Sequence, residues 1–179
     1  MKLNNYNNLL ELFFDQYEKQ DKNNIFLTNL GNPQHKLSWE KTYLLINHLS
    51  NKISKDIKLG DRCILISENR PEWLISDLAI MLAGGISVPS YTTYTTKDYE
   101  YIIKDCEPSV LIVSNKEQFN KVKDILDYKK IKKIISFDQL ENLDFENYLC
   151  IEDIINKNNN FKSFNSEISL KRTDPACII

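Results

Sequence analysis

Residues 63–89 decide the fold, and they read CILISENRPEWLISDLAIMLAGGISVP. The apolar run at 63–66 predicts a buried strand. Pro71 then lies where a helix can begin, because the N–H that proline lacks would have no partner in a first turn. Gly84 and Gly85 end that helix, and residues 86–89 predict the next strand, so the segment is a strand-helix-strand unit.

The residues that follow repeat this alternation. A helix is expected at 96–105, and the run Val110-Leu111-Ile112-Val113 is the all-apolar kind of strand that parallel sheets bury on both faces. Residues 114–117, SNKE, fit a capping box that opens another helix with Ser114 as its cap, and residues 134–135 begin a further strand. Strands alternating with helices predict an α/β fold, a parallel sheet flanked by helices.

The first fifty residues predict a mixed segment in front of the sheet. Apolar side chains at spacings of three and four indicate an amphipathic helix at 6–20. A short strand at 25–27 and a turn at 31–33 should follow, and Ser38 is expected to cap a helix that runs through Ile53.

The end of the sequence carries two further expectations. Residues 156–166 are polar and Asn-rich, which predicts a surface loop. Residues 174–179, DPACII, read as the start of a buried strand with no cap or polar tail after it. We therefore expect residues 1–179 to form one incomplete domain.

Composition excludes several classes of protein. The net charge is −2, and the arginines are only Arg62, Arg70 and Arg172, which argues against a nucleic-acid binder with a clustered basic surface. No apolar run approaches the ~20 residues that span a bilayer, and the first residues do not resemble a signal peptide. We expect a cytoplasmic location.

The chain lacks the common motifs for metals, nucleotides and nucleophilic catalysis. Its four cysteines are scattered without a Cys-x-x-Cys pair, so buried reduced thiols are favoured over a metal site. Its four glycines cannot form a Gly-x-Gly-x-x-Gly or Walker-type phosphate loop, and there is no Gly-x-Ser-x-Gly elbow. We expect no catalytic, cofactor-binding or metal-binding residue within the chain.

Asn69 and Arg70 are candidate substrate-side residues, because they lie between a strand and a helix. Sheets of α/β proteins place ligands at such positions, and helix N-termini attract anions. A phosphate site is therefore one hypothesis. The favoured alternative is a loop that caps the helix, with Arg70 in a surface ion pair.

Tyr91, Thr92 and Thr93 are further candidates, in the hydroxyl-rich run at 91–96. The run follows a strand and could line a substrate channel. We favour a structural role, because Thr and Tyr are common in strands and Thr95 or Thr96 can cap the next helix.

Three stretches resemble the adenylate-forming, AMP-binding enzymes in order and spacing. They are residues 37–40 (LSWE) at a helix start, residues 60–62 (GDR) before the first strand of the sheet, and residues 81–89. Residues 68–73 (ENRPEW) and 88–93 (VPSYTT) are most similar to bacterial long-chain fatty acid–CoA ligases. The resemblance extends from about Asn7 to the last residue and is weakest at 127–169.

The resemblance implies an ATP-dependent acid–thiol ligase. Members of this family join a fatty acid to ATP, which gives an acyl-adenylate and pyrophosphate, and then transfer the acyl group to coenzyme A; Mg²⁺ assists the first step. Their phosphate loop is expected directly after Ile179. The chain should then be an incomplete amino-terminal AMP-binding domain without the carboxy-terminal lid, inactive alone.

In the intact enzyme the chain would build part of the amino-terminal subdomain and support the outer wall of the acyl tunnel. It would also supply a surface for a homodimer, and peripheral contact with a membrane is left open. Two alternatives remain at this point. The parent could adenylate another acyl or aryl acid, or the chain could be a non-catalytic α/β binding module.

Overall fold

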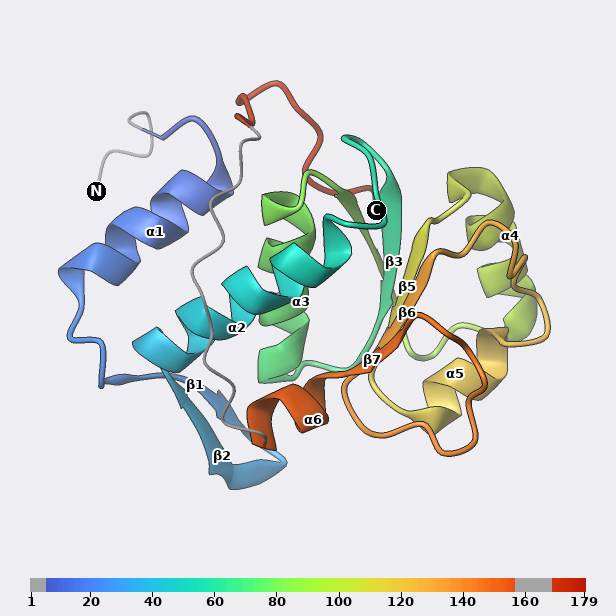
Figure 1. Cartoon of the computed structure of the whole chain (residues 1–179), viewed down its shortest axis with the longest axis horizontal. Helices are drawn as coiled ribbons and strands as arrows, with labels where there is room; N and C mark the ends of the chain where they lie inside the picture. Colours follow the sequence, from blue (N-terminus) through green and yellow to red (C-terminus); the bar gives the residue numbers. More distant parts are fainter. Residues whose placement is uncertain (1–5, 157–168) are drawn as a thin grey trace.

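The computed structural model describes residues 6–156 and 169–179. Within these ranges five parallel strands form one sheet in the order β4-β3-β5-β6-β7, and β1 and β2 pair as an antiparallel hairpin. Helices α2 and α3 lie on one face of the sheet, with α1 outside them, and α4 and α5 lie on the other face (Figure 1). The predicted α/β fold with a flanked parallel sheet is confirmed.

The first crossover of the sheet is the predicted strand-helix-strand unit. Strand β3 (Arg62–Ile66) leads into α3 (Pro71–Leu82), which has proline in its first turn, and then into β4 (Ile86–Ser90). Gly84 ends α3 with a φ of 85°, a left-handed conformation that suits glycine. Ile64 of β3 pairs with Val88 of β4 on one side and with Leu111 of β5 on the other.

The remaining elements extend the sheet on the other side of β3. Helix α4 (Thr96–Cys106) connects β4 to β5 (Val110–Val113), and α5 (Lys116–Val122) leads to β6 (Lys133–Ser136). A short strand β7 (Tyr148–Cys150) and helix α6 (Ile151–Asn156) follow, and neither was predicted. Among the described residues, no helix combines the length and apolar character needed to cross a bilayer.

The pleat of the sheet divides the apolar core into two clusters. Cys63 and Leu65 point to one face and pack with α2 and α3, whereas Ile64 and Ile66 point to the other face, where α4 and α5 lie. All four side chains are fully buried, which explains why this strand reads as a continuous apolar run.

The elements that precede the sheet in the sequence pack on the face of the sheet where α3 lies. They are α1 (Leu9–Lys19), β1 (Ile25–Asn29), β2 (Asn32–Ser38) and α2 (Trp39–Ile53). Ser38 caps α2 as predicted, since its hydroxyl accepts a hydrogen bond from the N–H of Lys41. Trp39 stacks on Phe26 with ring centroids 3.8 Å apart, so this tryptophan fixes the hairpin to α2.

Two local predictions were wrong. The turn expected at 31–33 lies earlier, because the side chain of Asn29 accepts hydrogen bonds from the N–H groups of Gly31 and Asn32, and Asn32 already begins β2. The cap of α5 is Asn115, whose side chain accepts from the N–H of Gln118, and not Ser114. Ser114 is one residue too early because its backbone still bonds to the neighbouring strands' ends: its N–H donates to the carbonyl of Ile66, and its carbonyl accepts from the N–H of Asp138.

The last residues join the sheet without being buried. Ser87 of β4 donates its backbone N–H to Ala176 and accepts from the N–H of Ile178, which makes a single parallel bridge with Cys177. In place of the strand predicted at 174–179, the structure thus has one bridge to β4. The expected burial was wrong, because Ile179 is fully exposed and Ile178 is 43% exposed, with no described element over them.

Two further predictions concern the cysteines and residues 156–166. Cys63, Cys106 and Cys150 are buried free thiols, as predicted, whereas Cys177 is exposed. The surface loop predicted at 156–166 lies, apart from its first residue, outside the described residues.

Candidate functional site

The order of the strands creates a topological switch point. From β3 the chain crosses to β4 over one face through α3, and from β5 it crosses to β6 over the other face through α5. The loops that leave β3 and β5 therefore diverge at the carboxyl edge of the sheet, which is where open α/β sheets bind ligands. We call the hollow at this place, about 690 Å³ in volume, the switch-point hollow; its lining includes His35, Glu68, Asn69, Arg70, Glu72, Asn115 and Asp138.

Arg70 is the centre of an ion-pair network in this hollow. Its Nη1 and Nη2 donate to the two carboxylate oxygens of Asp138 at 3.0 and 2.8 Å, and its Nε lies 3.3 Å from Oε2 of Glu72. Burial opposes the charge of Arg70, but the hydrogen bonds that it donates to Asp138 and the charge of Glu72 raise its pKa above the usual value. Arg70 occupies the N-cap position of α3 without a side-chain capping bond.

His35 extends this network to the hairpin. Its Nδ1 lies 3.6 Å from Oε1 of Glu72, whose side chain is 3% exposed. The other ring nitrogen, Nε2, is buried without a hydrogen-bond partner in the described part of the chain. The hairpin, the start of α3 and the loop after β6 thus meet around one buried carboxylate.

The balance of charge in the switch-point hollow does not suit a phosphate group. The carboxylates of Glu68, Glu72, Asp138 and Glu152 line the hollow together with the guanidinium of Arg70, and two of them, Glu72 and Asp138, already pair with it. An anion would have to displace Asp138 to make a bidentate bond with Arg70. The geometry of Arg70 corresponds to the ion pair that we favoured from the sequence, with the partner 68 residues away.

A second hollow lies beside β4, and we call it the edge hollow. It has a volume of about 810 Å³, and its lining includes Asn69, Trp73, Asp77, Tyr91, Thr92, Tyr101 and Ile178. Asn69 and Glu68 line both hollows, so the loop after β3 is the wall between them. Most of the edge hollow is apolar, and Tyr91 and Tyr101 are 68% and 72% exposed in it.

The loop after β4 is fixed by its backbone and leaves its side chains available. The buried Tyr99 hydroxyl donates to the carbonyl of Tyr91 at 2.7 Å, and Nζ of Lys121 donates to the carbonyl of Thr92 at 2.6 Å. Burial raises the pKa of Tyr99 to about 12, so it stays a neutral donor. Thr95 caps α4 in a capping box with Asp98, as one of the two caps expected there.

The structure brings four of the five candidates to these two hollows. Asn69 lines both, Arg70 lines the switch-point hollow, and Tyr91 and Thr92 line the edge hollow. Thr93 is exposed and is absent from both linings. Sequence reasoning missed His35 and Asp138, which carry no local motif, and Asn115, whose position directly after β5 could have identified it.

Some polar atoms at this edge are buried without partners among the described residues. They are the hydroxyls of Ser90 and Ser114 and Oε1 of Gln118. No group of three or more His, Cys, Asp or Glu residues in the described ranges could hold a metal ion.

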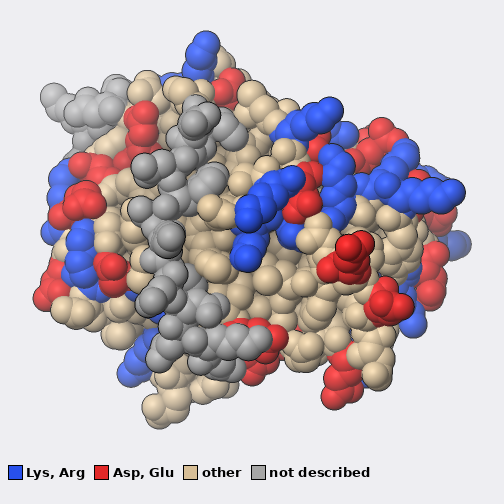
Figure 2. Space-filling model, viewed as in Figure 1, with Lys and Arg blue, Asp and Glu red and all other residues tan. Residues whose placement is uncertain are grey.

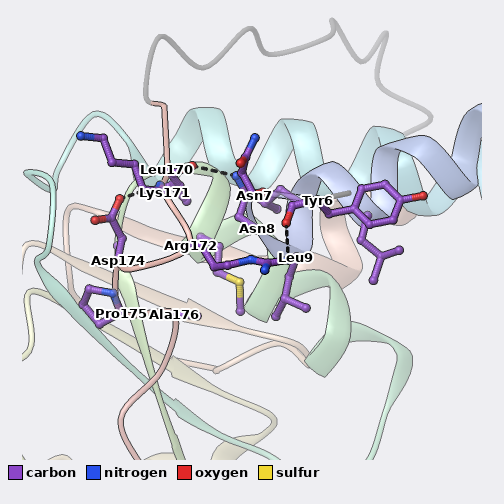
Figure 3. A pocket seen from close by; sticks show the side chains of 14 residues that line it. Tyr6, Asn7, Asn8, Leu9, Leu170, Lys171, Arg172, Asp174, Pro175 and Ala176 are labelled. Atoms are coloured by element: carbon purple, nitrogen blue, oxygen red, sulfur yellow. Dashed lines mark hydrogen bonds between the residues drawn. The ribbon is translucent and has the colours of Figure 1, made fainter. Parts of the chain in front are cut away.

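A third hollow, of about 300 Å³, lies away from the carboxyl edge between α1 and residues 170–176 (Figure 3). Two long-range hydrogen bonds close its sides. Nη2 of Arg172 donates to the carbonyl of Tyr6, and Nδ2 of Asn8 donates to the carbonyl of Leu170, both at 2.9 Å. None of the candidate residues lines this hollow. The two hydrogen bonds beside it join the two ends of the described chain.

Comparisons with known proteins point to one family. The model of the family described as "AMP-binding enzyme" matches residues 13–179. A long-chain-fatty-acid–CoA ligase, ACSBG2 of Xenopus laevis, is 27% identical over 132 residues, which are 71% of this chain and 18% of that protein. The chain spans about a fifth of the length of the curated relatives that it matches first.

Solved structures share the fold at low sequence identity. The coronafacic acid ligase of Pectobacterium brasiliense gives a TM-score of 0.72 at 20% identity, over 89% of this chain and 31% of that one. The anthranilate CoA ligase AuaEII gives 0.68 at 20% identity, over 90% and 29% of the two chains. At this identity the likeness concerns the fold.

Proposed function

The chain belongs to the AMP-binding enzyme family, and we propose that it forms the amino-terminal part of the AMP-binding domain of a long-chain fatty acid–CoA ligase. The observation that carries the proposal is the family match across residues 13–179, together with relatives named as long-chain-fatty-acid–CoA ligases. The chain resembles about a fifth of each relative. The reaction is therefore assigned to the whole protein that includes this chain.

The proposed reaction uses ATP, coenzyme A and Mg²⁺. The carboxylate of a fatty acid attacks the α-phosphate of ATP, releasing pyrophosphate and forming an acyl-adenylate. The thiol of coenzyme A then takes the acyl group and releases AMP. Mg²⁺ would neutralise phosphate charge when bound.

The residues of this chain do not fit the phosphate part of that task. Four glycines do not supply a phosphate loop, and the one arginine at the switch point is bound by Glu72 and Asp138. We therefore propose that these residues take no part in the chemical steps and that the chain is inactive alone. Asn69, Tyr91, Thr92 and Thr93 remain proposed substrate-side residues, and Arg70 is proposed to position the loop that carries Asn69.

A second candidate is the adenylation of an aryl or cyclic acid. Two structural neighbours support this candidate, because they are named as an anthranilate CoA ligase and a coronafacic acid ligase. A cytoplasmic location, inferred from the sequence, and a homodimer, which the family resemblance implies, are further parts of the proposal.

The test is an acid-dependent assay on the protein encoded by the complete gene. We expect acyl-CoA, AMP and pyrophosphate in equal amounts with palmitate, and a higher kcat/KM for palmitate than for acetate or anthranilate. The 179-residue chain alone is the control and should release no pyrophosphate. A preference for anthranilate or acetate would show that the substrate is not a long-chain fatty acid. Release of pyrophosphate by the 179-residue chain alone would contradict the proposal that this chain is inactive by itself.

A further inference from the structure

The edge hollow extends around β4 from one face of the sheet to the other. Trp73 and Asp77 in its lining belong to α3, and Tyr101 and Asp105 belong to α4. These two helices lie on opposite faces of the sheet (Figure 1). The hollow is therefore an elongated site, with a volume of about 810 Å³ and walls that are mostly apolar.

The charged side chains that line the edge hollow are all acidic. They are Glu68, Asp77 and Asp105, and no lysine, arginine or histidine of the described chain joins them in the lining. None of the three forms an ion pair within residues 6–156 and 169–179. Figure 2 shows a different distribution on one face of the molecule, where basic and acidic side chains are intermingled over the left and upper right parts. A hollow lined by one sign of charge attracts ligands of the opposite sign, so the ligand that fits is a cation.

Asp77 is the most enclosed of the three carboxylates. It is half-buried, whereas Glu68 and Asp105 are exposed. Burial raises the pKa of Asp77, and no positive charge among the described residues opposes this effect. An ammonium group bound beside Asp77 would stabilise its ionised form.

The lining also contains a buried hydroxyl group without a partner. Ser90, the last residue of β4, is 7% exposed, and its Oγ has no hydrogen bond within the described part of the chain. Buried polar groups in proteins normally have a hydrogen-bond partner. A donor group of a ligand in the edge hollow would supply the partner of Ser90.

Aromatic rings form another part of the lining. They belong to Trp73, Tyr91, Tyr94 and Tyr101. Tyr91 and Tyr94 meet edge to face with ring centroids 5.4 Å apart, and Tyr91 and Tyr101 are 68% and 72% exposed. The face of an aromatic ring attracts ammonium groups and also packs against hydrocarbon. Exposed rings beside carboxylates therefore suit a chain in which ammonium and methylene groups alternate.

We propose that the edge hollow is a binding site for a linear aliphatic polyamine. The ammonium groups of the polyamine pair with the carboxylates of Glu68, Asp77 and Asp105, and one N–H group donates to the hydroxyl of Ser90. The methylene groups between them contact the apolar and aromatic walls. The inference does not depend on the proposed reaction, because its readout is binding in the absence of ATP and coenzyme A.

The experiment is a titration of the chain with spermidine, followed by tryptophan fluorescence at submicromolar protein concentration. We expect a saturable change, because Trp73 lines the hollow, and an affinity that falls as the salt concentration rises. Asp77→Asn should weaken binding roughly tenfold, as the loss of one hydrogen bond between charged groups predicts. Tyr101→Ala should weaken it roughly threefold, as the loss of one cation–π contact at an exposed site predicts.

The matched control is Asp144→Asn, which removes the same charge from an exposed position outside the edge hollow and should bind spermidine as the unchanged chain does. Circular dichroism confirms that the variants fold. Putrescine, a diamine, should displace spermidine better than Mg²⁺, which carries the same charge without hydrocarbon. The proposal is overturned if Asp77→Asn binds as tightly as the unchanged chain, if Asp144→Asn loses as much affinity as Asp77→Asn, or if Mg²⁺ displaces spermidine as well as putrescine does.

Discussion

Arg70 lies at a position typical of ligand-binding residues, but its side chain forms ion pairs that stabilise the fold. Its side chain joins the start of α3 to the loop after β6 through a bidentate bond with Asp138, and it also faces the buried Glu72. The local sequence predicts a ligand-binding position, because strand-to-helix loops bind anions. The contact that decides the outcome lies far along the chain, where no local signal marks it.

We expect Arg70→Ala to lower the free energy of unfolding by about 2 kcal/mol, because the carboxylate of Glu72 would stay buried without its arginine partner. Asp138→Asn is the matched control. Asp138 is 45% exposed, so its loss should cost less than about 1 kcal/mol. Urea denaturation measures both, and equal losses would contradict the central role given to Glu72.

Asp77 allows a prediction about pH. Burial raises its pKa, an effect that the nearby Ser87 hydroxyl partly offsets. A raised folded-state pKa means that the folded protein binds the proton more tightly, so the ionised group destabilises the fold at neutral pH and the cost disappears as pH falls below the ordinary aspartate range. We expect Asp77→Asn to raise the melting temperature at pH 7 and to have no stabilising effect near pH 3. A gain of the same size at both pH values would show that charge is not the cause.

At the scale of elements, strong local signals predicted most of the sheet and the helices beside it. Buried apolar runs identified β3, β4 and β5, and Pro71 and Gly84 marked the ends of α3. Strand β2 was missed because NPQHKLS is polar and contains proline, and it exists through pairing with β1. Strand β7 has three residues, too few for a periodic pattern.

The two candidate hollows were predictable only in part. Each candidate residue follows a strand, and parallel strands end at one edge, so their approach to each other could be expected. The ion pairs of Arg70 and the position of His35 depend on the hairpin and on β6, whose placement the sequence does not encode locally.

The cap of α5 offers a paired test of two adjacent residues. Asn115 caps the helix, whereas the hydroxyl of Ser114 is buried without a partner among the described residues. We expect Asn115→Ala to cost about 1 kcal/mol and Ser114→Ala to be neutral or slightly stabilising. Thermal unfolding of the two variants decides between the caps, and the reverse order of stability would restore the sequence-based assignment.

At the scale of the whole molecule, β4 is one of the two edge strands of the sheet, and β7 is the other. Strand β4 is paired with β3 along its length, and on its other side it meets a single bridge at Cys177. Ile178, Ile179 and Tyr91 are exposed beside that edge. Unpaired backbone groups next to apolar side chains are a template for association with further strands.

We therefore expect the 179-residue chain to self-associate at micromolar concentration, as measured by size-exclusion chromatography with light scattering. Ile178→Lys should reduce the mass toward that of a monomer, because charge next to an edge strand opposes pairing. Leu30→Lys is the control, since Leu30 is 92% exposed on the hairpin turn away from β4. A monomeric chain with a cooperative melt would favour the self-sufficient binding module.

The loop after β3 separates two hollows. Glu68 and Asn69 line the switch-point hollow on one side of this loop and the edge hollow on the other. A displacement of this loop toward one hollow enlarges the other by a similar amount. Two ligands bound in these hollows would consequently change each other's affinity without direct contact. The direction in which the first ligand displaces Asn69 would decide whether the affinity for the second rises or falls.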